Sequence, residues 1–348
     1  MSTVLSAKPS KPWTASPRER LTSLSIFLAS VAFSYFLVAI TELKGKLAYF
    51  LVFFGTLAVL NYLRGRITKD AMNGKDLFFG TLMVIGIVLT VIPIASILMT
   101  VFVRGASGLH KSLITSDMSL ATPQDPITNG GVLHAIVGTI ILVSVALIIS
   151  FPIAILTALY LTEIKGKFTR PIRFLVQAMS GVPSIVAGLF ILSSIVFPIT
   201  KAYSGFVGSL ALVILMIPTI ARTSEEVLNL IPNDLREAGV ALGGTQWRTV
   251  AMVVVPAAKS GLVTALILGV ARVAGETAPI LLLTGGGDSL NFNPLNGAMG
   301  SLPFYVWKCF MIGTEESVTR GWTGLLVLLV VVLILFAAAR LVGSRKSS

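Results

Sequence analysis

The chain has 348 residues, of which 55% are hydrophobic and only 12% are charged, and it carries a formal net charge of +12. A soluble domain has roughly 25% charged residues, so this composition excludes an ordinary soluble protein and indicates a membrane protein with several spans. The basic excess does not indicate nucleic-acid binding, because no basic cluster alternates with aromatic residues on a polar face. Basic residues at the cytoplasmic ends of spans produce the same charge balance.

The N-terminal segment, residues 1–22, is rich in Ser, Thr, Pro, Lys and Arg. We expect a disordered cytoplasmic tail there, with Pro17 the last of three prolines that would break a helix. An apolar run from Leu24 to Ile40 follows. No small-residue cleavage site follows this run before Glu42 and Lys44, so we interpret it as a retained span and not as a signal peptide.

Seven further apolar runs follow, and a helix needs about 20 apolar residues to cross a bilayer. They lie at 47–63, 77–103, 132–161, 172–198, 203–220, 260–284 and 321–342. We therefore predict eight spans in an all-α polytopic membrane protein. Of the Lys and Arg residues, 19 lie in the N-terminal segment and in alternate gaps, against 7 in the opposite gaps, which places both termini in the cytoplasm.

Two long loops, 104–131 and 285–320, lie on the opposite side. The second loop contains a partly apolar stretch, Leu302–Ile312, which we predict as a short surface helix. Its triple glycine, Gly285–Gly287, does not indicate a phosphate loop, because the chain has no G-x-x-x-x-G-K-[ST] motif. We therefore expect no ATP site in this chain.

No metal site is predicted either. His110 and His134 stand far apart, and neither has a cysteine or carboxylate at ligand spacing. The single cysteine, Cys309, excludes an intrachain disulfide.

Between residues 221 and 258 the chain becomes polar but keeps a helical periodicity. The apolar positions that form one stripe are Leu228, Leu230, Ile231, Leu235, Ala238 and Leu242. Pro232-Asn233-Asp234 signals a helix start, with Asn233 or Asp234 as N-cap. Gly243-Gly244-Thr245 signals its end, so we predict a short helix and a turn at the cytoplasmic surface.

Arg272 lies near the middle of the apolar run 260–284, which would place it near the centre of the bilayer. A central Arg costs about 2.5–3.5 kcal/mol on insertion scales, so it should face protein or water. Glu276 follows one turn later on the same face and can pair with it. The pair is either purely structural or a binding charge on a substrate path, where the planar donor fork of Arg suits an oxyanion. Pro279 would loosen the same helix.

Another break is expected within the run 172–198. Gly181, Pro183 and Ser184 can interrupt a helix there and leave free N–H groups at a new helix start, which favour anions. A plain kink is the alternative.

Four motifs carry a family resemblance over about residues 77–342. In chain order they are Gly181-Val182-Pro183-Ser184-Ile185-Val186-x-Gly188-Leu189-Phe190, Arg222-Thr223-x-Glu225-Glu226, Glu237-Ala238-Gly239-x-x-x-Gly243 with Val253-x-Val255-Pro256 nine residues later, and Ala271-Arg272-x-x-Gly275-Glu276-Thr277-Ala278-Pro279. The third resembles the EAA loop of ABC importer permeases, with Gly239 in place of the second Ala. Together the motifs resemble the phosphate-specific ABC importer permeases, and the Glu-Thr-Ala-Pro ending resembles their PstA subunits and not their PstC subunits.

The resemblance implies a type I ABC importer permease core of six transmembrane helices, here within residues 76–343. It implies that Arg272, Glu276 and Arg222 lie on the substrate path, and that Glu237, Ala238, Gly239 and Gly243 belong to a coupling helix that docks on an ATPase. The implied partners are a PstC-like permease subunit, two PstB-like ATPase subunits that bind ATP and Mg, an external PstS-like phosphate-binding protein and the lipid bilayer of the bacterial inner membrane. The two N-terminal spans, within residues 23–75, depart from the six-span pattern, and we expect an accessory packing or assembly role for them.

Other functions remain open at this point. An ABC permease for another oxyanion, sulfate or molybdate, would share the same scaffold. A secondary transporter would need inverted repeats and ion-coupling carboxylates at membrane depth, and only Glu276 qualifies. A membrane-embedded enzyme is disfavoured, because neither H-E-x-x-H nor G-x-S-x-G is present.

Overall fold

The computed structural model describes residues 17–41, 43 and 45–344, and within them the chain is helical with no strand. The α-helices are α1 Pro17–Ile40, α2 Lys46–Thr68, α3 Ala71–Ala106, α4 Leu133–Leu159, α5 Thr169–Ser180, α6 Ser184–Ile191, α7 Gly205–Asn229, α8 Asn233–Ala241, α9 Gln246–Thr249, α10 Val255–Ala274, α11 Ala278–Leu283, α12 Leu302–Ile312 and α13 Glu315–Ser344. Three π-helices extend or precede them, namely η1 Tyr160–Ile164, η2 Leu192–Thr200 and η3 Val250–Val254.

Seven helices of the described part are long and apolar enough to cross a membrane. An eighth span results if Thr169–Ser180 and Ser184–Thr200, which meet at an angle of 105°, are counted as one. The all-α polytopic architecture is confirmed, and the predicted break at Gly181–Pro183 is present. It is a sharp bend between two helices and not a slight kink.

The chain divides into two compact units, Met1–Leu98 and Met99–Ser348. In the first, α1 packs on α2 through Phe27 and Phe53, whose rings are 5.4 Å apart. The start of α3 packs on α2, where Asn61 donates a hydrogen bond of 3.0 Å to Thr81. The division falls inside the continuous helix α3, so the boundary that we predicted between residues 75 and 76 does not coincide with it.

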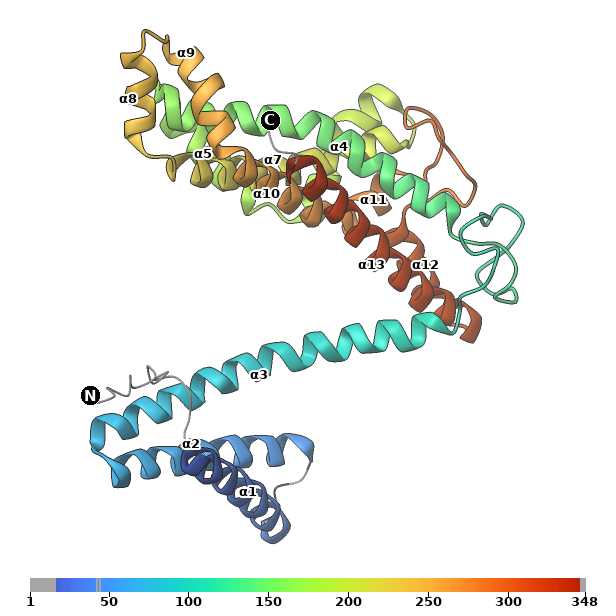
Figure 1. The fold of residues 1–348 in the computed structure, drawn as a ribbon. Helices are drawn as coiled ribbons and strands as arrows, with labels where there is room; N and C mark the ends of the chain where they lie inside the picture. The colour runs from blue at the N-terminus through green and yellow to red at the C-terminus, as the bar shows by residue number, and fades with distance from the viewer. Residues whose placement is uncertain (1–16, 42, 44, 345–348) are drawn as a thin grey trace, which may run out of the picture. The chain divides into compact units, whose positions relative to one another are not determined.

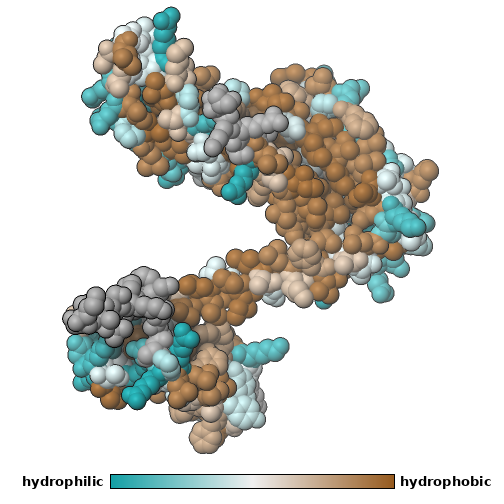
Figure 2. All heavy atoms as spheres, viewed as in Figure 1, coloured by the Kyte–Doolittle hydropathy of each residue, from teal (hydrophilic) through white to brown (hydrophobic). Residues whose placement is uncertain are grey.

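The second unit is built around α4, α7 and α10. Its core contains fully buried side chains such as Leu142, Leu212 and Met216. The α8–α9 hairpin lies at one end of this unit, and the loop that joins α3 to α4 lies at the opposite end (Figure 1). Figure 2 shows hydrophobic residues along the helices between these ends and hydrophilic residues gathered at both ends, as expected for a bundle that crosses a bilayer.

Two predicted helix limits are wrong because the chain has no breaker where its polarity changes. Helix α1 begins at Pro17, so residues 17–22 are helical and not a disordered tail; the rest of that tail, 1–16, lies outside the described residues. Proline is favoured at the first position of a helix, where its missing N–H has no partner to lose. Helix α7 continues past 220 to Asn229, because neither Gly nor Pro occurs between Pro218 and Pro232.

The prediction of one continuous helix over 260–284 is also wrong. The helix starts at Gln246, runs through η3 and ends at Ala274, and α11 follows after a break. A proline inside an α-helix clashes with the carbonyl four residues earlier; the wider turn of η3, directly before Pro256, relieves this clash. Arg272 consequently lies in the last turn of α10 and not near the middle of a helix over 260–284.

The predicted helix Leu302–Ile312 is present as α12, but it is not a surface helix. Leu302, Tyr305 and Cys309 are buried, and α12 packs on α13. Gly321 and Gly324 of α13 allow this close approach, since a Cβ on Gly324 would lie 2.9 Å from Val306.

Candidate functional site

The predicted ion pair between Arg272 and Glu276 is present at a helix break. Arg272 Nη1 donates to Glu276 Oε1 at 2.5 Å. Helix α10 ends at Ala274, Gly275 caps it, and Glu276 lies in the short link before α11. The carboxylate is 12% exposed and the arginine side chain 48% exposed. The carboxylate thus anchors one side of the guanidinium, while the exposed part of the side chain is accessible from outside this chain.

The second break lies beside the first. Helix α6 begins at Ser184, after the Gly181–Pro183 link, and packs against α11. A Cβ on Gly188 would lie 3.0 Å from Pro279 Cα, so the two helices touch within about one turn of their starts. The structure therefore brings together the two interrupted segments that carry Gly181, Pro183 and Ser184 on one side and Arg272 with Glu276 on the other.

Arg222 is not brought together with Arg272. Helices α7 and α10 are antiparallel neighbours, because Gly269 faces Ile220 while Gly261 faces Val227. By this register Arg222 lies roughly six residues, or about 9 Å, along the bundle from the level of Arg272. It also follows Ile220 by two residues, about 200° around α7, and so leaves the face that contacts α10.

The surroundings of Arg222 are open. Its partner is Glu226 on the same helix, at 3.4 Å, and both side chains are about two-thirds exposed. Exposed pairs of this kind contribute little to stability. Arg222 is therefore an accessible positive charge at the end of α7 and not a member of a closed cluster.

The predicted coupling loop forms a helical hairpin of α8 and α9. Helix α8 starts after Pro232, which occupies the N-cap position that we assigned to Asn233 or Asp234. It contains Glu237 and Ala238, and none of its residues is buried. The apolar side chains near it are largely exposed: Leu235 42%, Val240 54% and Leu242 90%. An unburied helix with apolar side chains of this kind is typical of a surface that another protein covers.

The structure explains why glycine occupies positions 239 and 243 of this loop. A Cβ on Gly239 would meet Thr249 Cγ2 at 2.5 Å, so an alanine at this position would clash with α9. This contact accounts for the departure from the E-A-A pattern. Gly243 has φ +82°, the left-handed conformation that ends helices and favours glycine.

Sequence reasoning missed two ion pairs between segments far apart in the chain. Arg173 of α5 contacts Glu225 of α7 at 2.6 Å, and Arg236 of α8 contacts Glu163 of η1 at 2.8 Å. Glu163 is 7% exposed. One sequence feature could have indicated its pairing with a basic residue: Glu163 directly follows the apolar run 132–161, on the side where the basic loops lie.

A cavity of about 740 Å³ lies next to this second pair. It is bounded by η1, by the end of α7 and by α8 and α9, and its polar lining includes Asn229, Asn233, Gln246 and Thr249. This recess lies between the hairpin and the spans, and Arg272 is not among the residues that line it.

The chain is similar to proteins of known families. Residues 150–348 match the family described as "Binding-protein-dependent transport system inner membrane component". The chain is 37% identical over 264 residues to the phosphate transport system permease protein PstA 1 of Mycobacterium tuberculosis (strain CDC 1551 / Oshkosh), covering 74% of this chain and 86% of that protein. It is 37% identical over 281 residues to the phosphate transport system permease protein PstA of Mycobacterium leprae, covering 79% of this chain and 90% of that protein.

Among solved structures, the chain is similar to an inward-facing conformation of the MetNI methionine ABC transporter. The TM-score is 0.48 at 22% identity, over 61% of this chain and 92% of that chain. The family match and the two relatives determine the family: this chain belongs to the inner membrane components of binding-protein-dependent transport systems, in the group of the PstA permease proteins.

Proposed function

We propose that this chain is the PstA-type permease subunit of an ATP-driven ABC importer that moves inorganic phosphate across the cytoplasmic membrane of a bacterium. The observation that carries this proposal is the 37% identity to PstA proteins over most of both chains. The site geometry agrees with it, since a half-exposed arginine at a helix break is a suitable contact for an oxyanion.

Arg272 is the proposed substrate contact. A guanidinium presents donors in a fixed fork that matches the oxygens of a tetrahedral anion. Glu276 uses one of these donors and fixes the orientation of the group, while 48% of the arginine side chain stays exposed. Arg222, about 9 Å away along the bundle, is the proposed second positive charge, near the cytoplasmic exit. Gly181, Pro183 and Ser184 shape the helix break that borders this path.

The α8–α9 hairpin is the proposed coupling element. Glu237 and the exposed side chains of Leu235, Val240 and Leu242 would dock on a PstB-like ATPase subunit, one of two in the complex. ATP and Mg would be bound by those subunits, because this sequence has no phosphate-binding motif of its own. A PstC-like permease subunit would complete the path, and an external PstS-like protein would deliver phosphate.

The proposed orientation places both termini in the cytoplasm, from the distribution of Lys and Arg along the sequence. The hairpin then lies on the cytoplasmic side, and the loop between α3 and α4 lies outside. The two N-terminal spans have a proposed accessory role in packing or assembly.

The proposal is tested by uptake of radiolabelled phosphate and sulfate in cells that lack this chain. Phosphate uptake should be lost and sulfate uptake retained, and expression of the wild-type chain should restore phosphate uptake. Unchanged phosphate uptake would contradict the proposal, and selective loss of sulfate or molybdate uptake would favour the alternative oxyanion.

A further inference from the structure

Glu163 is attached to both helices of the α8–α9 hairpin. Its side chain accepts from Arg236 of α8, with Nη2 at 2.8 Å from Oε1 and Nε at 3.1 Å from Oε2. Its backbone carbonyl accepts from Gln246 Nε2 of α9 at 2.7 Å. One residue, in the π-helix that ends α4, therefore holds both halves of the hairpin.

Arg236 extends this attachment to α7. Its Nη1 donates to the carbonyl of Ile231 at 2.6 Å, and its Nη2 donates to that of Leu228 at 2.9 Å. These carbonyls lie at or just beyond the end of α7, where the helix leaves acceptors without intrahelical partners. A single guanidinium thus links α8, the end of α7 and Glu163.

Helix α8 has no buried apolar side chain that could replace these bonds; the apolar contact with α4 is made by η3, where Val250 and Val254 pack with Ala158 and Leu159. No residue of α8 is buried, and a cavity of about 740 Å³ separates the hairpin from the spans beside Glu163. The close contact of Gly239 with Thr249 joins α8 to α9 and not to the spans. Polar contacts through Glu163 and Arg236 are therefore the main described connection between α8 and α4.

The chain that follows Glu163 runs to the helix break beside the candidate substrate path. Two residues later, Lys165 has φ +51°, a left-handed conformation that costs a non-glycine residue energy and marks a joint in the backbone. Helix α5 follows, then the bend before α6, and Gly188 of α6 contacts Pro279, which follows Glu276 by three residues. A displacement of Glu163 would thus reach the Arg272–Glu276 pair without passing through α10.

We propose that Glu163 is a positioning residue that transmits movement of the docked α8–α9 hairpin to α4, α5 and the helix break at Gly181–Pro183. This inference rests on the proposed function, because it assigns the hairpin to ATPase coupling. It adds a second connection, by side chains, to the covalent one that runs through Pro256 into α10.

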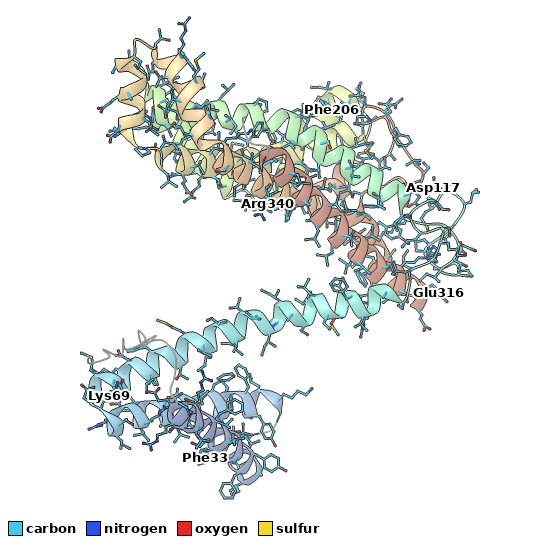
Figure 3. All side chains as sticks on the ribbon, viewed as in Figure 1. Phe33, Lys69, Asp117, Phe206, Glu316 and Arg340 are labelled. Atoms are coloured by element: carbon cyan, nitrogen blue, oxygen red, sulfur yellow. The ribbon has the colours of Figure 1, made fainter. Side chains whose placement is uncertain are left out.

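The test uses the complete importer, reconstituted in proteoliposomes with its binding protein. Glu163→Gln preserves the shape of the side chain and removes the charge that Arg236 requires. The ATPase subunits should still co-purify and hydrolyse ATP, but the phosphate moved per ATP should fall at least about fivefold, the low end of typical coupling between sites. Glu163→Asp, which keeps the charge, should recover part of the loss. Glu316→Gln, the same chemical change on the exposed first turn of α13 (Figure 3), is the matched control and should leave the ratio unchanged.

A second measurement does not depend on the substrate. Hydrogen exchange of α8 peptides should rise in Glu163→Gln, while exchange of the α4 interior stays constant. An unchanged ratio of phosphate to ATP, or loss of the ATPase subunits on purification, would overturn the transmission role. Unchanged exchange of α8 would overturn the attachment itself. Failure of the wild-type complex to move phosphate would instead contradict the proposed function, and the exchange comparison would still decide the role of Glu163 as an attachment point.

Discussion

Gly188 of α6 lies directly against Pro279 of α11, so that a Cβ on the glycine would come within 3.0 Å of the proline Cα. The contact joins two helices that each follow a break in a membrane-spanning segment. Backbone atoms meet here, and neither partner can move aside as a flexible side chain would. The distance between the two breaks is therefore set by the absence of a side chain at residue 188.

Replacing Gly188 by valine should force the two breaks apart. Overpacking of a tight contact costs about 1–3 kcal/mol, and the displacement would move Glu276, three residues before Pro279. We expect a lower melting temperature of the complex and a loss of phosphate transport. Gly275→Ala is the control, because a Cβ at Gly275 meets nothing within 4 Å. Normal transport by Gly188→Val would show that the spacing of α6 and α11 does not matter for the path.

Arg272→Ala should strongly reduce the rate of transport while the complex still assembles. Loss of a charge-assisted hydrogen bond costs about 1.5–3 kcal/mol, which corresponds to roughly 10- to 100-fold in transport rate. Arg272→Lys should retain part of the rate, because the charge remains but the planar fork is lost. Initial rates of phosphate uptake and the yield of purified complex are the measurements.

The Arg272→Ala experiment needs a control for the effect of leaving the Glu276 carboxylate unpaired. Glu276 is 12% exposed, so Arg272→Ala leaves it without its partner and could destabilise the chain for that reason alone. The double variant Arg272→Ala/Glu276→Ala removes both charges. If the double variant restores transport, the pair is structural and Arg272 is not a substrate contact.

Glu237→Lys should weaken docking of the ATPase without changing the fold of this chain. Glu237 lies on α8, which buries none of its residues, so the substitution meets no packing constraint within the chain. Reversal of charge at an interface typically changes association by several-fold or more. Co-purification of the ATPase subunits at two salt concentrations measures the effect. Glu316→Lys, on α13 outside the hairpin, should leave co-purification unchanged.

The sequence predicted the architecture well because each membrane span appears in it as a run of apolar residues. Apolar runs of sufficient length predicted eight spans, against seven among the described helices or eight when the bent pair is counted as one. The break at Gly181–Pro183 was predicted from two residues that disrupt helices. The Arg272–Glu276 pair followed from their separation of four residues within a helical segment. These features are local, so a single sequence contains them.

Features that depend on tertiary contacts were not predictable in the same way. The pair of Arg236 with Glu163 joins residues 73 positions apart, and no periodicity links them. The span that carries Arg272 was predicted as one helix that Pro279 would loosen, and not as two helices with a break after Ala274; apolar character continues through this break and conceals it. The limits of α7 and α10 were misplaced because polar residues continued both helices, and Pro256 was accommodated by a π-helical turn.

Asp117 connects the loop before α4 to the loop after α11. Its Oδ1 accepts from the hydroxyl of Ser119 at 2.7 Å, and its Oδ2 accepts from the backbone N–H of Leu290 at 3.0 Å. Figure 3 shows Asp117 in the loop region at the end of the unit away from α8 and α9. The hydrogen bond from Ser119 is the main cause that holds the pKa of Asp117 below its ordinary value of 3.8, and the bond from Leu290 adds to it.

A lowered pKa gives a defined pH dependence. The carboxylate contributes stability that is fully present above the unfolded-state pKa and is lost as the pH falls through the lower folded-state pKa. At about pH 7, Asp117→Asn should reduce local stability by about 1.5 kcal/mol, or roughly tenfold in the exchange rate of the Leu290 amide. The ratio of exchange rates between variant and wild type should approach one as the pH falls below the folded-state pKa. A ratio that stays constant with pH, or equal rates near neutrality, would show that the charge of Asp117 does not hold the two loops together.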